Sequence, residues 1–418
     1  MAVLLLGTYD LGRQPFGLAS PVAWLRRAGV EVHAIDLSRD RLDPHAVSAA
    51  SLVAFYLPMH TATRLALPMI DRVRAINPAA TICAYGLYAP LNEAILREHG
   101  VSVILGPEAE EELVSLAGGT EVPPLRTLPP SRQLPRLNFI APDRSGLPAL
   151  DRYASLQMPD GTTKIVGATD ASRGCKHRCR HCPIVPVYDG QFRVVPVDVV
   201  MADVGSQVAR GATHITFGDP DFFNGPTHAR RIVDALHREH PQVTYDAIIK
   251  IEHLLAHREL LPVLARTGCL FVTSAVESVD DRVLEKLDKG HTRADFILAA
   301  ELCRSAGLTL VPTFVAFTPW TTVASYVDLL KVLDDLGLTA HVAPVQLAIR
   351  LLVTWQSRLL ELPDIQAVIG PFDPNTLTYP WTHPDPRVDA LQQTMMELAN
   401  APRMSRSAIP YMNEPWYC

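Results

Sequence analysis

The chain has 418 residues, of which 48% are hydrophobic and 20% charged, a balance that is ordinary for a globular protein with a large buried core. The formal net charge is -6 and the pI is near 6.2, so no basic excess argues for nucleic-acid binding. No apolar run reaches the roughly 18 residues of a membrane span. The opening MAVLLLG lacks the basic start and the cleavage site of a signal peptide.

The first 118 residues alternate short apolar runs with helical patterns. This alternation predicts an α/β unit, a doubly wound parallel sheet with helices on both faces. On such sheets, ligands bind beyond the carboxyl ends of the strands. The expected strands span 2–7, 30–38, 51–59, 80–86 and 101–106, and the expected helices span 21–29, 62–76, 91–100 and 107–117.

A proline-rich stretch separates this unit from a second one. Residues 119–160 show little periodicity, and we expect a linker that lies over the surface. Across 161–350 the alternation resumes, and six βα units in series predict a partial (β/α)6 barrel of the TIM type, with its chemistry at the carboxyl ends of the strands. Residues 351–418 are expected to form a C-terminal extension with one helix near 387–399. The expected barrel strands span 162–168, 213–219, 243–250, 269–278, 308–317 and 338–347.

Three of the seven cysteines lie in the segment CKHRCRHC, as Cys175, Cys179 and Cys182. A disulfide would leave one thiol over. The alternative is a structural zinc site, whose fourth ligand would be His177 or His181. Iron–sulfur clusters are held by thiolates, and three thiolates leave one iron of a cubane open. Four basic side chains flank the thiols and would offset the charge of thiolates and sulfides: Arg173, Lys176, Arg178 and Arg180.

The other four cysteines are scattered. Cys83, Cys269 and Cys303 lie in apolar patterns and are expected to be buried as small hydrophobic residues. An odd total without an even framework points to a reducing compartment, so we expect a cytoplasmic protein. Cys418 is the last residue of the sequence, and a frayed terminus is the simplest interpretation of it.

The spacing Cys-x-x-x-Cys-x-x-Cys after the first strand of a six-unit barrel resembles the radical S-adenosylmethionine (SAM) superfamily. The resemblance implies that Cys175, Cys179 and Cys182 bind a [4Fe–4S] cluster whose open iron is chelated by the amino and carboxylate groups of SAM. It also implies that one electron, from an external reductant such as flavodoxin or ferredoxin, splits a carbon–sulfur bond, usually giving a 5′-deoxyadenosyl radical. The residue before the third cysteine usually lies near the adenine, and here it is His181.

Two further segments resemble those of the superfamily. FGDPDFF follows the second barrel strand, where relatives hold the amino group of SAM, and Gly218, Asp219 and Asp221 resemble the acidic variant of cobalamin-associated members. A carboxylate there would face an ammonium group, whereas the alternative is a turn with aspartate caps. SAVES resembles a Gly-x-Glu-Ser segment, which implies that Ser274 and Glu277 lie near the ribose or carboxylate of SAM. Glu277 is otherwise a helix cap.

Three more polar residues follow barrel strands. Lys250, after the third strand, either meets a substrate anion or is solvated. Gln346 and Arg350 lie around the expected sixth strand. No motif identifies the substrate, because pockets at the barrel mouth differ freely between members of one fold. We expect the substrate to be a small molecule.

The segment LGPEAEEEL resembles the cobalamin-binding domain that precedes many radical enzymes, in which a Gly-Glu-Gly-Glu run follows the last strand. Gly106, Glu108 and Glu110 fit that pattern, and the residues between them depart from it. No Asp-x-His-x-x-Gly run is present, so we expect no histidine ligand to cobalt at the usual place, and His60 is interpreted as an ordinary loop histidine. Two alternatives remain open: the domain binds cobalamin, or it is vestigial.

The ending NEPWYC resembles a radical SAM group named for a Cys-Cys-Ala-Glu-Pro or Cys-selenocysteine-Ala-Glu-Pro tail. The likeness implies that the printed sequence stops at a UGA codon and that the protein is a selenoprotein continuing beyond Cys418. Mass spectrometry of the native protein that found Cys418 at the terminus would remove this hypothesis.

Four functions compete on the sequence alone. The first is cobalamin-dependent methyl transfer to an unreactive centre, and the second is hydrogen abstraction without cobalamin. The third is transfer of the 3-amino-3-carboxypropyl group to a soft acceptor. From another class, the chain could be an iron–sulfur or zinc binding module without catalysis.

Overall fold

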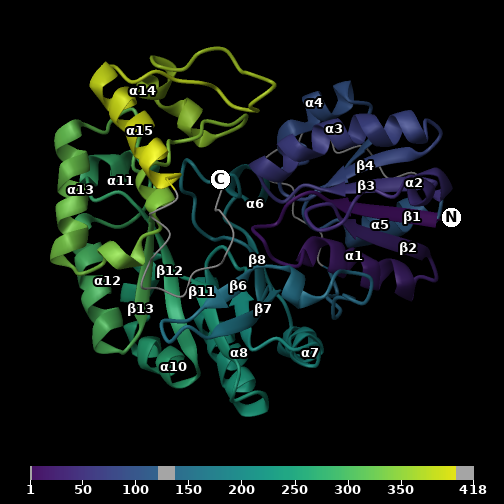
Figure 1. The fold of residues 1–418 in the computed structure, drawn as a ribbon, viewed down its shortest axis with the longest axis horizontal. Helices are drawn as coiled ribbons and strands as arrows, with labels where there is room; N and C mark the ends of the chain where they lie inside the picture. The colour runs from purple at the N-terminus through teal and green to yellow at the C-terminus, as the bar shows by residue number, and fades with distance from the viewer. Residues whose placement is uncertain (1, 121–136, 402–418) are drawn as a thin grey trace.

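The computed structural model describes residues 2–120 and 137–401, which form two α/β units side by side (Figure 1). The first unit is a five-stranded parallel sheet in the order β2-β1-β3-β4-β5. Its inner strands are continuous apolar runs such as AVLLLG, as parallel strands covered on both faces require. The strands are β1 (Ala2–Gly7), β2 (Glu31–Asp36), β3 (Leu52–Tyr56), β4 (Thr81–Tyr85) and β5 (Val103–Ile104), and the helices are α1 (Phe16–Arg27), α2 (Pro44–Ala49), α3 (His60–Ile76), α4 (Glu93–Glu98) and α5 (Glu110–Ala117).

Helices cover both faces of this sheet. Leu25 of α1 and Leu113 of α5 belong to one buried apolar cluster, and Ile70 of α3 and Leu96 of α4 belong to the other. The predicted doubly wound sheet is therefore confirmed. Its strand order reverses between β1 and β3, and the carboxyl ends of these strands border the crevice where ligands of such sheets bind.

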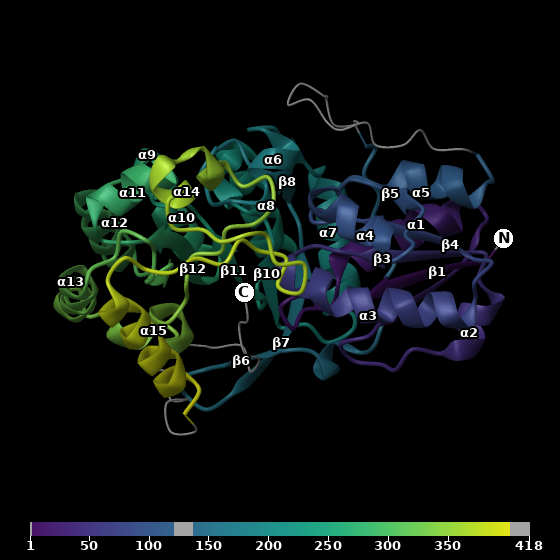
Figure 2. The same ribbon diagram turned by 90° about the horizontal axis from the view of Figure 1, so that it is seen from above.

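The second unit is a curled six-stranded sheet in the order β13-β12-β11-β10-β7-β6, which confirms the predicted partial barrel. β6 pairs with β7 in the antiparallel sense and the other neighbours are parallel. Helices α12 and α13 lie on the side away from the first unit in both views (Figure 2). The strands are β6 (Ser155–Gln157), β7 (Thr163–Thr169), β10 (His214–Phe217), β11 (Thr244–Ile248), β12 (Cys269–Glu277) and β13 (Thr309–Phe314), and the helices are α7 (Val197–Val208), α8 (Pro226–Glu239), α9 (Ile251–Ala256), α10 (Leu261–Arg266), α11 (Asp281–Leu287), α12 (Arg293–Ser305) and α13 (Val323–Asp335).

Two segments differ from the predicted strand pattern. Residues 338–347 form the short 3-10 helices η5 (Thr339–His341) and η6 (Pro344–Leu347) instead of a sixth parallel strand. Pro344 explains part of this difference, because a proline cannot donate to a strand ladder. A single parallel bridge between Phe317 and Arg350 remains at that edge. At the opposite edge, β6 comes from the segment expected to be linker.

The remainder of the described linker, residues 137–154, is partly buried. Arg144 is 1% exposed. Its guanidinium lies 2.7 Å from Asp203 on α7 and also donates to the carbonyl of Ala168 at 2.7 Å. A buried bidentate ion pair of this kind fixes the segment against the barrel. The prediction that the linker lies over the surface is therefore confirmed for only part of these residues.

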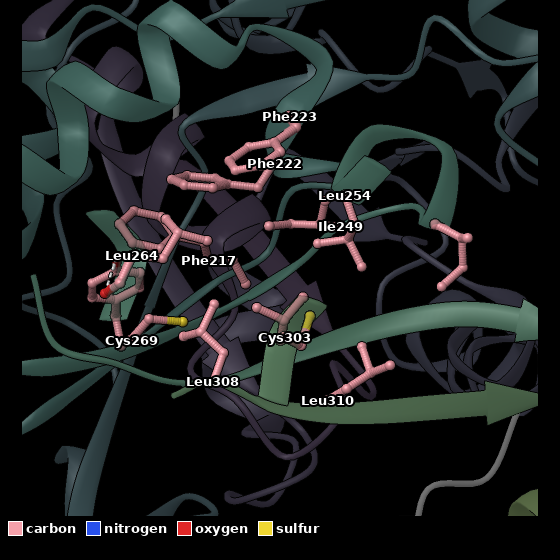
Figure 3. Close-up of a cluster of buried hydrophobic side chains, with 14 of the residues drawn as sticks. Phe217, Phe222, Phe223, Ile249, Leu254, Leu264, Cys269, Cys303, Leu308 and Leu310 are labelled. Carbon is pink, nitrogen blue, oxygen red and sulfur yellow. Dashed lines mark hydrogen bonds between the residues drawn. The ribbon is translucent and has the colours of Figure 1, made fainter. Parts of the chain in front are cut away.

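The main core lies between the barrel sheet and its helices (Figure 3). Phe217 and Phe222 pack with ring centroids 4.7 Å apart. Cys269 and Cys303 belong to this core, and Cys83 is buried in the first unit, as predicted. Burial also raises the pKa of Cys303 to about 12, which suits a thiol that acts as a small hydrophobic residue.

The C-terminal part lies across the barrel and carries α14 (Pro363–Gln366) and α15 (Pro386–Ala399). The predicted helix near 387–399 is confirmed as α15. Cys418 and the tail likeness lie outside the described residues. Among the helices of residues 2–120 and 137–401, none combines the length and apolar character of a membrane span.

Candidate functional site

The three cysteines lie in the connection between the two strands of a small hairpin at the carboxyl end of β7. Its strands are β8 (Ser172–Gly174) and β9 (Phe192–Val194), and the short helix α6 (Val185–Tyr188) lies between them. Gly174 has φ +77°, and a Cβ there would lie 2.4 Å from the ring of Tyr188, so only glycine fits this turn. Asn224 holds the segment from the next loop, because its amide donates to the carbonyl of Gly174 at 3.3 Å and accepts from the N–H of Lys176 at 3.2 Å.

All three thiols of the segment are free. Burial, together with the charges of Cys179 and Cys175, raises the pKa of Cys182 to about 12. Burial also raises the pKa of Cys175. Three neighbouring thiols without a fourth form a donor set that fits a cubane cluster with one open iron. Their service as ligands stays a prediction.

A buried lysine lies beside the thiols. Lys289, in the loop after α11, is 3% exposed, and its Nζ lies 3.4 Å from Oε1 of Glu277. Burial works to lower the pKa of Lys289, but Glu277 and the thiols of Cys179 and Cys182 outweigh it and raise that pKa. The sequence analysis missed this cation, because it lies 107 residues beyond the third cysteine and belongs to no local motif.

Three of the basic residues expected to offset the cluster charge bind other groups. Arg173 lies 2.7 Å from Glu110 of the first unit. Arg178 lies 3.3 Å from Asp189. Arg180 donates to the carbonyls of Glu285 and Lys286 at the end of α11. These three arginines, which neighbour the cysteines in the sequence, therefore form ion pairs and hydrogen bonds that hold the cysteine segment in place.

The acidic segment after β10 is buried and internally bonded. Gly218 leaves no room for a side chain, because a Cβ would lie 2.6 Å from Asp170. Asp219 is 1% exposed and accepts from the N–H of Ala171 at 2.9 Å and from the hydroxyl of Ser172. Burial raises the pKa of Asp219 to about 7. Asp219 thus anchors the start of β8, and its expected contact with an ammonium group stays a prediction.

Asp221 lies between two imidazoles. Its Oδ2 is 2.6 Å from Nδ1 of His253 and 3.3 Å from Nε2 of His177, and its Oδ1 accepts from the N–H of Phe223 at 3.1 Å. Burial works to raise the pKa of Asp221, but the two imidazoles outweigh it and bring that pKa to about 2. Asp221 is therefore a turn cap, as the alternative predicted, and its place near the amino group of SAM stays a prediction.

Lys250 is buried rather than solvated, at 8% exposed. Its Nζ lies 3.1 Å from Nδ1 of His177 and 3.0 Å from Glu252. Gly290 packs on this pair, since a Cβ there would lie 2.8 Å from Glu252. The loop that carries Lys289 therefore also reaches the carboxyl end of β11.

The end of β12 brings together three of the predicted residues. Glu277 has φ +70°, at a register shift in the pairing of β12 with β13, and such strain in a non-glycine residue is typical of functional sites. Its Oε1 lies 3.1 Å from Nε2 of His181. Burial works to raise the pKa of Glu277, but Lys289 and His181 outweigh it and bring that pKa to about 2. Ser274 is 0% exposed, and its hydroxyl finds no hydrogen-bond partner in the described chain.

Three other candidates have structural partners. Gln346 accepts from the N–H of Phe314 at 3.1 Å and so closes the edge where the sixth strand is missing. Arg350 lies 2.6 Å from Asp389 and stacks over Trp381. His60 was expected to lie in a loop, but it is the buried first residue of helix α3, and its Nε2 lies 2.6 Å from the carbonyl of Thr376.

Glu110 of the predicted cobalamin motif forms an ion pair with Arg173, next to the cysteine segment. Glu110 accepts from Arg173 and from Ser20, both at 2.7 Å, and is 3% exposed. Burial raises the pKa of Glu108 to about 7. Val187 and Tyr188, just after the thiols, complete an apolar cluster of the first unit.

The cavity enclosed between this edge of the first sheet and Arg173 does not fit a corrin. Its volume open to water is about 50 Å³, and its lining includes Phe16, Tyr56, Tyr85 and Arg173. Sites for drug-sized ligands are several-fold larger, at about 300–1,000 Å³, and cobalamin is larger than such ligands. Around this cavity the described residues therefore form a packed contact between the two units.

Comparisons with known proteins agree with this geometry. Residues 170–331 match the model of the radical SAM superfamily. A curated relative, tRNA-2-methylthio-N(6)-dimethylallyladenosine synthase of Sorangium cellulosum, is 25% identical over 279 residues, which cover 59% of this chain and 52% of the relative. The enzyme of that name from Alkalilimnicola ehrlichii is 26% identical over 46% of this chain and 44% of its own length. The chain thus spans about half the length of the curated relatives it matches.

Solved structures share the fold across both units. The radical SAM methyltransferase TsrM from Kitasatospora setae, with cobalamin and a [4Fe–4S] cluster bound, has a TM-score of 0.66 at 17% identity and covers 80% of this chain and 70% of its own. The cobalamin-dependent SAM radical enzyme OxsB has a TM-score of 0.69 at 13% identity and covers 94% of this chain and 66% of its own. At such identities the likeness shows the fold alone.

Proposed function

We propose that this chain is a radical SAM enzyme and that it uses a [4Fe–4S] cluster on Cys175, Cys179 and Cys182 to cleave SAM reductively and form a radical. The match of residues 170–331 to the superfamily model supports this proposal. The observation that carries the proposal is the set of three free, mutually interacting thiols at the carboxyl end of β7, within the matched segment. When bound, such a cluster supplies the electron that breaks the carbon–sulfur bond. An external one-electron reductant such as flavodoxin or ferredoxin would deliver that electron.

The residues around the thiols have proposed roles in binding and orientation. Lys289 places a buried positive charge beside Cys179 and Cys182, and Glu277 holds this lysine and His181 together. Ser274 is fully buried with an unpartnered hydroxyl, and it keeps its proposed place near the ribose or carboxylate of SAM. Gly218, Asp219 and Asp221 keep their proposed place near the amino group of SAM.

The test is SAM cleavage by the anaerobically reduced protein. The wild type should release 5′-deoxyadenosine, whereas Cys179→Ala should lose the visible absorbance of the cluster and the cleavage activity together. Cys303→Ala, which removes a thiol from α12, should keep both. Methylthioadenosine as the product would instead indicate transfer of the 3-amino-3-carboxypropyl group. If no cleavage product forms in protein that carries its cluster, the chain is a binding module and the proposal fails.

Cobalamin-dependent methyl transfer is the second candidate, because TsrM and OxsB share the order of both units. The cavity of about 50 Å³ between the first sheet and Arg173 argues against it. We therefore derive no step through cobalamin. Cobalt and iron content of anaerobically isolated protein separates the candidates, since stoichiometric cobalt would favour methyl transfer.

We propose a small-molecule substrate. The curated relatives carry a name that refers to tRNA, but this chain has a net charge of -6, which argues against a polyanionic partner. Transfer of label from SAM to tRNA would contradict this part of the proposal. The likeness of the ending to the Cys-selenocysteine-Ala-Glu-Pro group also stays a proposal, with mass spectrometry of the native protein as its test.

A further inference from the structure

We propose that His177, Asp221 and His253 bind a divalent transition-metal ion at a site separate from the three thiols. One ligand atom from each residue lies within 4.8 Å of the other two. Nδ1 of His253 and Nε2 of His177 both face Oδ2 of Asp221, at 2.6 and 3.3 Å. Among residues 2–120 and 137–401, no other trio of histidine, cysteine or acidic side chains meets this spacing.

The three facing atoms are buried and unsatisfied. Asp221 is 1% exposed and His253 is 3% exposed. Nε2 of His177, Oδ2 of Asp221 and Nδ1 of His253 have no well-aligned hydrogen-bond partner, although they lie close together. A buried polar atom without a partner costs about 1–3 kcal/mol. A single metal ion accepts a lone pair from all three atoms and removes this cost at once.

The other ring nitrogen of His177 lies near a carboxylate and an ammonium. Nδ1 lies 3.6 Å from Oε2 of Glu252, and histidine ligands commonly direct their second nitrogen to a carboxylate. Nζ of Lys250 lies 3.1 Å from the same Nδ1 and pairs with Glu252 at 3.0 Å. Because an ammonium only donates, metal binding at Nε2 requires the lysine to leave Nδ1 and keep its pair with Glu252, so that the Nδ1 proton faces the carboxylate. Two carboxylates against one ammonium leave a surplus negative charge for a cation.

The donor set indicates the kind of ion. Two imidazoles and one carboxylate with an open position suit Zn²⁺ or Fe²⁺. The ligands come from the cysteine segment, from the loop after β10 and from α9, so the ion would fasten the cysteine segment to two neighbouring parts of the barrel. This inference goes beyond the proposed function, because it requires neither the cluster nor SAM.

The first experiment removes the thiols that would compete for zinc. Full-length, tag-free Cys175→Ala/Cys179→Ala/Cys182→Ala protein is loaded with ZnCl₂ and dialysed, and its zinc is measured by elemental analysis. We expect one zinc per chain. Adding His253→Gln should lower the zinc content about tenfold, whereas adding His257→Gln, whose ring lies 5.8 Å from that of His253, should leave it unchanged. Background zinc in the parent, or equal zinc in both variants, would overturn the proposal.

A second measurement needs no substitution, in case the triple variant does not fold. Wild-type protein is isolated anaerobically, its accessible thiols are blocked with N-ethylmaleimide, and it is loaded with zinc. X-ray absorption at the zinc edge then gives the ligand type. Nitrogen and oxygen ligation alone supports the site. Sulfur ligation, or the absence of retained zinc, contradicts it, and neither result depends on SAM cleavage.

Discussion

At the scale of single residues, a positive charge that interacts with the thiols comes from a distant part of the chain. Lys289 is buried against Glu277 and interacts with Cys179 and Cys182. Three of the four basic residues of the segment itself bind other groups, as the pair of Arg173 with Glu110 illustrates. Charge and burial around a cluster set its reduction potential, so Lys289 is the residue expected to tune it.

Lys289→Gln should make the reduction potential of the cluster more negative, because a nearby positive charge stabilises the added electron. We expect a shift on the order of 60 mV, the equivalent of a tenfold change for a one-electron couple. Redox titration followed by electron paramagnetic resonance measures it. Lys286→Met removes a lysine from α11 that pairs with Asp364 at the surface and should leave the potential unchanged. Equal potentials in wild type and Lys289→Gln would contradict the assignment.

At the scale of elements, α5 of the first unit contacts β8 of the barrel through a buried ion pair. The pair of Glu110 with Arg173 is buried, Ser20 donates to the same carboxylate, and the guanidinium lies 5.3 Å from the ring centre of Phe16 and 5.1 Å from that of Phe139. Arg173 lies two residues before the first cysteine. The first unit therefore positions the cysteine segment through this contact, whether or not it binds a cofactor.

Glu110→Gln should destabilise the protein, because it leaves Arg173 as a buried charge without its partner. Breaking a buried ion pair costs about 3–5 kcal/mol, and we expect the lower end, since glutamine can still accept a hydrogen bond. Denaturant unfolding of the cluster-free protein measures the loss. Glu111→Gln, in the same turn of α5 but exposed, is the matched control. Equal stability of the two variants would show that the contact is incidental.

At the scale of the whole molecule, the interface between the two units makes stability depend on pH. Burial raises the pKa of Glu108 from 4.5 to about 7. Below pH 4.5 both the folded and the unfolded state hold the proton. Between pH 4.5 and 7 the unfolded state loses it first, so the free energy of unfolding falls as pH rises through this window, by about 3 kcal/mol at most.

Glu108→Gln should flatten this part of the pH dependence, because a neutral amide imitates the protonated acid at every pH. Relative to wild type, the variant should be more stable at pH 8 and similar near pH 4.5. Denaturant unfolding between pH 4.5 and 8 checks it. Glu98→Gln, at an exposed position, should retain the wild-type slope, and an unchanged slope in Glu108→Gln would show that this acid ionises equally easily in both states.

Local pattern determined much of this protein. Apolar runs and helical periods give the order of strands and helices in both units, because burial on one or two faces imposes those periods directly. The spacing of Cys175, Cys179 and Cys182 indicates a shared cluster, because ligands from one short loop need only a few residues of chain. The prediction of a sixth barrel strand over residues 338–347 was wrong, since apolar content alone does not show that a segment can form a strand ladder.

Tertiary structure decided the rest. Lys289 beside the thiols, His253 facing Asp221, and Glu110 bound to Arg173 all join residues that lie 32 or more positions apart in the sequence. The tertiary surroundings also changed the pKa values of these groups. Burial raises the pKa of Glu108, and the neighbouring acid and thiols raise the pKa of the buried Lys289. Such effects depend on distance and on the exclusion of water, and neither is set until the parallel strands bring their carboxyl ends to one edge.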